Sequence, residues 1–269
     1  MDAIDAFNIL VHFFENVDIL LLIFVRVLGF VLILPIIASQ NIFMQGRLFL
    51  AFTISVALFM SGMVTTVYYF DTTVGYVYLI LIEFLVGLAM GYTVFAVFNL
   101  IFFAGQLMDF QIGFMMVNVM DPMTQIQVPI TGNVFFFCMT AMLVVTGGIH
   151  AFFLTFFYSY HVLPIGTAVV IGNASLALYM VGILSESVVL AVRLAMPIVG
   201  TILVVNGALG IMVKVSPQMN IFSVGLPIKI FIGLLLLWLV MAPQIGTMFG
   251  LIFDMAIEGM RQVIWGMTP

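Results

Sequence analysis

The chain has 269 residues, of which 65% are hydrophobic and 6% charged, and its mean hydropathy is +1.36. Soluble domains carry about 25% charged residues, so this composition indicates a membrane protein or the interior of a helical assembly. The single Cys138 excludes a disulfide framework and a multi-cysteine metal site. The net charge of −5 provides neither a basic surface for nucleic acid nor a polybasic lipid anchor.

Six hydrophobic runs are long enough for transmembrane helices, which need about 20 mostly apolar residues. They cover about 19–38, 48–70, 74–104, 128–160, 176–205 and 227–253. Gly147-Gly148 predicts a bend in the fourth run, and Pro197 and Pro243 predict interruptions of the fifth and the sixth. We therefore expect an all-α protein of about six long, partly broken helices arranged as hydrophobic hairpins.

Charges outside these runs give the expected topology. The first 18 residues contain four acidic residues and no basic one, unlike a cleaved secretory signal, so we expect the first run to remain in the mature protein. Arg47, Lys214 and Lys229 lie in or beside the odd-numbered connectors, whereas Arg261 lies in the C-terminal tail. The positive-inside rule then predicts that these connectors are cytoplasmic and that both termini lie outside.

Four charged residues lie inside the hydrophobic runs: Arg26, Glu83, Glu186 and Arg193. Each costs a few kcal/mol at the centre of a bilayer and should face protein or water, so we expect all four to be buried charges. Arg26 and Glu83 could pair between the first and third runs, and Glu186 and Arg193 could share one helix face. We favour a role in holding packed helices together, because a transporter concentrates its ionisable groups at one midplane site. The alternative is an ion-coupled secondary transporter that uses Glu83 and Glu186.

Gly87 and Gly91 form a G-x-x-x-G pattern in the third run. Such spacing lets helices approach closely, although it arises easily by chance in a chain with 23 glycines. Together with the charges inside the runs, it indicates a chain that packs against other helices rather than against lipid alone.

Residues typical of catalysis are scattered. His12, His150 and His161 are far apart and lack metal-ligand spacing, and Cys138 lies in an apolar run. The sequence has no phosphate-binding or dinucleotide-binding glycine motif. We therefore expect a protein that is not an enzyme and has no cofactor.

The segment 105–125, GQLMDFQIGFMMVNVMDPMTQ, contains five methionines and two phenylalanines beside two aspartates and three glutamines. It is too polar to lie against lipid as a helix and too apolar for a solvated loop. Irregular backbone at membrane depth is tolerated only where protein buries it or where it lines a cavity. Methionine adapts to irregular shapes, so we expect this segment to be a deformable seal rather than another helix.

The stretch 206–234, NGALGIMVKVSPQMNIFSVGLPIKIFIGL, resembles the signature of the FliR-type subunit family of the flagellar and type III secretion export gate. The matching positions are Asn206, Leu209, Gly210, Lys214, Pro217, Gln218, Met219, Asn220, Phe222, Gly225, Pro227 and Gly233. The segment 105–125 and its neighbour match the same family in Asp109, Gln111, Gly113, Asp121, Pro122 and Pro129. Lys214 departs from the pattern, because an arginine is usual there and a lysine cannot make its bidentate contacts.

The resemblance implies a FliP-like part, 1–175, fused to a FliQ-like helical hairpin, 176–269. It also implies a bacterial inner-membrane location at the flagellar basal body and partners of the FliP, FliQ and FlhB types. The chain would help unfolded export substrates cross the membrane. The residues implied for a plug loop that closes the channel are Asp109, Phe110, Gly113, Phe114, Met115, Met116, Met120, Asp121 and Pro122. The residues implied for a cytoplasmic tip, within 206–229, are Lys214, Pro217, Gln218, Met219 and Asn220.

Overall fold

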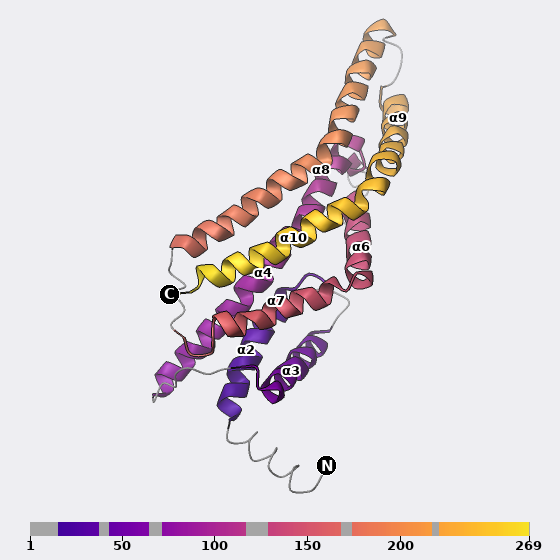
Figure 1. Ribbon diagram of the computed structural model, residues 1–269. Helices are drawn as coiled ribbons and strands as arrows, with labels where there is room; N and C mark the ends of the chain where they lie inside the picture. Colours follow the sequence, from indigo (N-terminus) through magenta and orange to yellow (C-terminus); the bar gives the residue numbers. More distant parts are fainter. Residues whose placement is uncertain are drawn as a thin grey trace. The chain divides into compact units, whose positions relative to one another are not determined.

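The structure is a computed structural model that describes residues 16–37, 43–64, 72–116, 129–167, 174–216 and 221–268. Within these ranges every regular element is a helix, which confirms the all-α prediction (Figure 1). The elements are α2 (Val17–Ile33), α3 (Met44–Ser61), α4 (Thr73–Ile112), α6 (Ile130–Val145), α7 (Gly148–Val162), α8 (Ala174–Val215), α9 (Ile221–Leu236), the π-helical turn η1 (Leu237–Met241) and α10 (Ala242–Gly266).

Two of the predicted interruptions are present. The bend at Gly147 separates α6 from α7, and Gly147 has a φ of +72°, a conformation that side chains with a Cβ rarely adopt. At the other position, Pro243 follows η1 and lies in the first turn of α10. A π-helical turn lets the chain continue where proline removes a backbone hydrogen bond.

Two helices are longer than predicted. The third predicted run ends near Ala104, but α4 has 40 residues and extends to Ile112. The expectation that 105–125 avoids helix is therefore wrong for 105–112. The fifth run is not interrupted at Pro197, because α8 continues through that residue over 42 residues. Near Pro197, the Thr201 hydroxyl donates a hydrogen bond of 2.8 Å to the Pro197 carbonyl oxygen.

The contacts of the chain divide it into two compact units. Unit 1 comprises Met1–Phe95, His150–Val181 and Ile257–Pro269, and unit 2 comprises Ala96–Ile149 and Gly182–Ala256. The unit boundaries therefore fall within α4, α7, α8 and α10. The predicted boundary near residue 175 separates a FliP-like part from a FliQ-like part, whereas these units are defined by contacts. The predicted boundary therefore stays a prediction.

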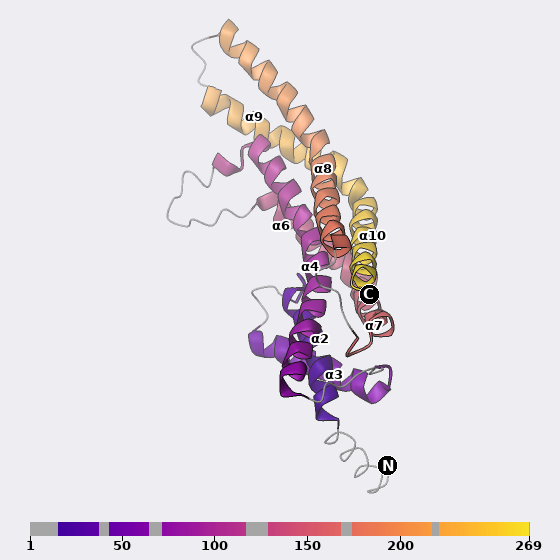
Figure 2. The same cartoon turned by 90° about the vertical axis from the view of Figure 1, so that its left-hand side faces the viewer.

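In unit 1, α2, α3, α7 and the N-terminal half of α4 pack together, and both views place α2, α3 and that half of α4 close to one another (Figures 1 and 2). Glycines bring α2 and α4 into backbone contact. A Cβ on Gly87 would lie 2.0 Å from the Arg26 carbonyl oxygen, and one on Gly91 would lie 2.8 Å from the Phe30 carbonyl oxygen. The close packing predicted from the G-x-x-x-G pattern is thus present between these two helices.

In unit 2, the C-terminal part of α4 packs against α6 and α9. A Cβ on Gly105 would lie 2.3 Å from both the Cα and the backbone nitrogen of Gly132 in α6. In the same way, a Cβ on Gly233 of α9 would lie 2.7 Å from the Ile112 side chain. These contacts fix the end of α4 between two other helices.

Among the described residues, four helices are long and apolar enough to cross a membrane, or five if α6 and α7 form one broken span. The predicted first run is not among them, because α2 ends at Ile33 and Leu34 takes an extended backbone before Pro35. In the 18-residue apolar segments that identify these spans, only 22% of the segment in α8 and 11% of the segment in α9 is buried within the chain. Most of these two helices is therefore available to lipid or to other proteins.

Candidate functional site

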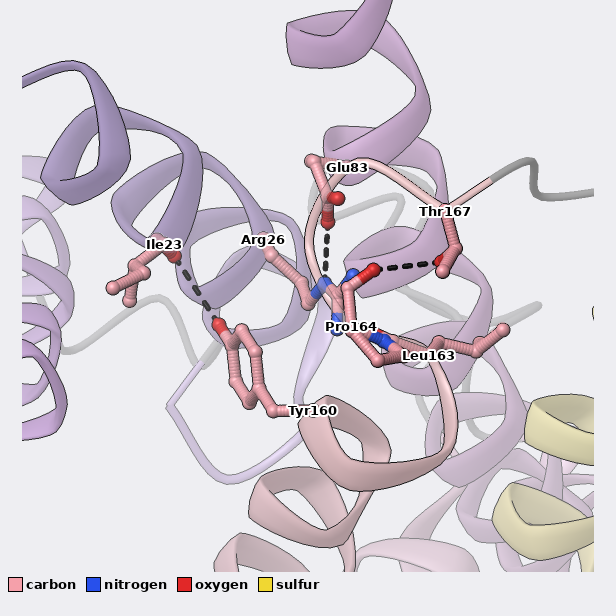
Figure 3. Close-up of polar contacts among 7 residues, drawn as sticks. All are labelled: Ile23, Arg26, Glu83, Tyr160, Leu163, Pro164 and Thr167. Carbon is pink, nitrogen blue, oxygen red and sulfur yellow. Dashed lines mark hydrogen bonds and ion pairs between the residues drawn. The ribbon is translucent and has the colours of Figure 1, made fainter. Parts of the chain in front are cut away.

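The predicted pairing of Arg26 and Glu83 is present inside unit 1 (Figure 3). Arg26 Nε donates a hydrogen bond of 2.5 Å to Glu83 Oε2, and the two side chains are 0% and 1% exposed. Arg26 Nη1 donates a second bond of 2.9 Å to the carbonyl oxygen of Leu163, just after α7. One arginine thus joins α2, α4 and the end of α7.

Tyr160 completes this cluster. Its ring lies under the guanidinium, with Arg26 Cζ 4.5 Å from the ring centroid. Its hydroxyl donates a hydrogen bond of 3.4 Å to the carbonyl oxygen of Ile23 (Figure 3). The planar, delocalised guanidinium suits a site that offers a carboxylate, a carbonyl and an aromatic face at once. Arg26 Nη2 has no hydrogen-bond partner among the described residues.

The contacts of this cluster hold α2, α4 and α7 together. A buried ion pair contributes little net stability, but removing one partner leaves a buried charge without compensation. The Glu83 carboxylate is buried and bound to Arg26, so it has no exposed surface at which to exchange ions. Among the described residues, no group of three or more histidine, cysteine, aspartate or glutamate side chains could hold a metal ion.

A second polar contact lies in unit 2, where Asp109 of α4 meets the start of α6. The backbone N–H of Thr131 donates to both carboxylate oxygens, at 3.3 and 3.2 Å, and the Thr131 hydroxyl donates to Oδ1. Pro129, which precedes α6, provides no side-chain cap of its own. The carboxylate of Asp109 therefore caps α6 from another helix and complements its N-terminal dipole.

Asp109–Thr131 and Gly105–Gly132 together form what we call the α4–α6 clamp. The clamp holds the two ends of the connection between α4 and α6 beside each other. α4 ends one residue before Gly113, whose φ is +99°. Asp109 is 2% exposed, so its side chain points into the packed helices rather than into open space.

The plug residues predicted from the resemblance divide into two groups. In the described part, Phe110 is 69% exposed and Met116 is 48% exposed, whereas Gly113, Phe114 and Met115 are partly buried. Met120, Asp121 and Pro122 lie outside the described residues.

The predicted cytoplasmic tip is described only at its beginning. Lys214 is exposed in the last turn of α8, where a cation complements the C-terminal helix dipole. Pro217, Gln218, Met219 and Asn220 lie outside the described residues.

The expectation that Glu186 and Arg193 are buried is wrong for the chain on its own. Both side chains are exposed on α8, and no ion pair joins them among the contacts of the described residues. They share one face, as predicted, because both line a groove of about 440 Å³ in unit 2. The part of the chain that the structure describes does not cover either charge.

Two partners in these contacts were not predicted. Tyr160 and Thr131 are an aromatic and a hydroxyl residue in apolar stretches, and neither is unusual there. Pro129 shortly after the polar segment does indicate a helix start near Thr131, but not which acid would cap that helix.

Comparisons with known proteins connect these sites to a family. The model of the bacterial export proteins, family 1, matches residues 17–256, a range that contains the Arg26 cluster, the α4–α6 clamp and the groove. The chain belongs to this family. Within the bacterial export proteins, the chain is similar to the flagellar biosynthetic protein FliR of several bacteria.

It is 28% identical to that of Bacillus subtilis over 246 residues, which cover 91% of this chain and 93% of the relative. It is 27% identical to that of Escherichia coli over 87% of this chain and 89% of the relative. It is 31% identical to that of Aquifex aeolicus over 82% of this chain and 84% of the relative. The resemblance to a FliR-type export subunit is thus confirmed for this bacterial export protein.

Proposed function

We propose that the chain is a non-enzymatic subunit of a flagellar protein-export gate in the bacterial inner membrane. It assembles there with FliP-type and FliQ-type subunits and with an FlhB-type switch protein, and unfolded export substrates pass through the channel they form. Membership in the bacterial export family and the names of the relatives support this assignment.

The observation that carries the proposal further is the α4–α6 clamp. A segment that opens and closes a channel must be able to move without unravelling the helices on either side. The Asp109–Thr131 contact and the Gly105–Gly132 contact hold these helix ends independently of the residues between them. Asp109 therefore acts at the base of the plug loop, as an anchor rather than as a residue that faces the channel.

The plug loop itself begins at Gly113. Its apolar members, Phe114, Met115, Met116 and Met120, seal the channel by conforming to it, since methionine side chains are flexible. Gly113, Asp121 and Pro122 shape its turns. A hydrophobic constriction excludes water and ions and still yields to a passing chain.

The second loop, with Lys214, Pro217, Gln218, Met219 and Asn220, forms the tip of the FliQ-like hairpin at the cytoplasmic mouth. The positive-inside rule supports this placement through Lys214 and Lys229. The alternative of an ion-coupled transporter gains nothing from the structure, because Glu83 is held by Arg26.

Co-expression with FliP-type and FliQ-type subunits from the same source tests this function. We expect an affinity tag on the chain to recover one stable complex whose mass, measured by native mass spectrometry, contains all three proteins. The chain expressed alone is the control and is expected to transport nothing after reconstitution. Recovery of the chain without either partner, together with ion transport by the purified chain, would favour the transporter instead.

A further inference from the structure

The cap at the end of α4 fixes the direction in which the chain leaves this helix. Gly113 follows the last helical residue, Ile112, and has a φ of +99°. The backbone N–H groups of Gly113 and Phe114 both donate to the Asp109 carbonyl oxygen, at 3.0 and 3.1 Å, and so form a left-handed helix cap. The Met116 N–H then donates a bond of 3.0 Å to the Gly113 carbonyl oxygen. The conformation at Gly113 therefore sets how the plug loop begins.

One face of α9 packs against this cap. A Cβ on Gly113 would lie 2.8 Å from Leu226 Cδ1, so the Leu226 side chain lies directly against the cap. About two turns further along α9, a Cβ on Gly233 would lie 2.7 Å from both Cγ atoms of Ile112, which is 0% exposed. Each helix thus presents a glycine to an aliphatic side chain of the other helix. We call the Leu226–Gly113 and Gly233–Ile112 contacts the α4–α9 latch.

The rest of α9 is loosely held by the part of the chain that the structure describes, since only 11% of its 18-residue apolar segment is buried. At its C-terminal end, α9 continues through the π-helical turn η1 to Pro243 and α10, and the chain bends there (Figure 1). π-helical turns and prolines are places where helices bend. The latch is therefore the contact that opposes a tilt of α9 about η1.

We propose that Leu226 and Gly233 of α9 are positioning residues for the plug loop. While the latch is closed, Leu226 holds Gly113 in the conformation that starts the plug loop, and a tilt of α9 about η1 releases it. Any partner that binds the tilted α9 more tightly then opens the channel without touching the plug loop. The inference rests on the proposed function, because it takes the segment after Gly113 as the plug.

Overpacking the latch tests this coupling. Gly233→Ala places a methyl group against three side-chain atoms of Ile112 and should force α9 away from α4. In planar bilayers, we expect the conductance of the purified complex to rise by at least about fivefold, because such a misfit shifts a two-state equilibrium by that factor or more. Adding Ile112→Ala removes these three atoms and is expected to restore the low conductance. The matched control is Gly200→Ala in α8, where a Cβ would meet nothing within 4 Å, and it should change nothing.

Leu226→Ala provides a second latch variant, because it removes the side chain from Gly113 without adding volume to the packed helices. We expect it to raise the conductance as well. In a chain whose residues 114–125 are replaced by a glycine and serine linker, neither Gly233→Ala nor Leu226→Ala should add conductance, since α9 acts through that segment.

Three results would overturn the inference: unchanged conductance in an assembled latch variant, failure of Ile112→Ala to restore it, or a further rise in the linker background. A linker variant that leaks while the latch variants stay closed removes only the coupling to α9 and leaves the proposed function standing. A linker variant that does not leak counts against the plug itself.

Discussion

Replacing Glu83 with glutamine is expected to lower the free energy of unfolding by about 3–5 kcal/mol, the range found when one partner of a buried ion pair is removed. The charge of Arg26 would then stay buried at 0% exposure beside a neutral side chain. The Leu163 carbonyl and the Tyr160 ring are dipolar or quadrupolar partners and cannot neutralise it. Because Arg26 joins α2, α4 and the end of α7, the loss would loosen unit 1 as a whole.

The matched control is Glu258→Gln. Glu258 lies 4.0 Å from Arg261 in the same unit, but their side chains are 60% and 56% exposed, so this pair is expected to contribute less than about 1 kcal/mol. Thermal unfolding of the purified complex should show a loss of about 10 °C for Glu83→Gln and a change near zero for Glu258→Gln. Replacing both members of the buried pair, as Arg26→Met with Glu83→Leu, should recover much of the loss. Equal effects of the two single glutamine variants would show that the Arg26 cluster does not hold unit 1 together.

Replacing residues 114–125 with a short glycine and serine linker is expected to leave the complex assembled and to make it leak ions. The linker begins after Gly113 so that Asp109 can still cap α6 through Thr131. A deletion that starts at residue 109 would remove the α4–α6 clamp and confuse loss of the plug with loss of packing. Conductance of the purified complex in planar bilayers measures the leak.

The control keeps the length of the segment and changes only its character. Leucine in place of Phe114, Met115, Met116 and Met120 preserves an apolar seal and should leave the conductance near that of the natural chain. Serine at the same four positions should raise the conductance toward that of the linker variant. If an assembled complex with the linker conducts no more than the natural one, residues 114–125 do not close the channel.

Local signals in the sequence were enough for several features of the fold. A glycine pair predicted the break between α6 and α7, because glycine can adopt the positive φ that Gly147 has at the bend. Burial of charge predicted the pairing of Arg26 with Glu83, since an isolated charge in an apolar helix needs a counter-charge.

The features that the sequence did not reveal depend on partners that are distant along the chain. α4 continues past Ala104, and the carboxylate of Asp109 on this extension is satisfied by Thr131, 22 residues away. Glu186 and Arg193 looked like buried charges because they lie in an apolar run, yet both side chains are exposed on α8. The sequence indicates that a charge in an apolar run must be covered. It does not indicate whether the same chain or another protein covers that charge.

Thiol crosslinking shows whether the segment after Gly113 faces the path of exported protein. Cys138 is first replaced by alanine, and single cysteines are then placed at Phe114, at Met116 and, as a control, at Val204. An export substrate with a cysteine in its unfolded part and a stably folded domain behind it is arrested during passage. We expect crosslinks to this substrate from positions 114 and 116 and none from position 204. Arrested substrate that crosslinks to neither 114 nor 116 would contradict this placement.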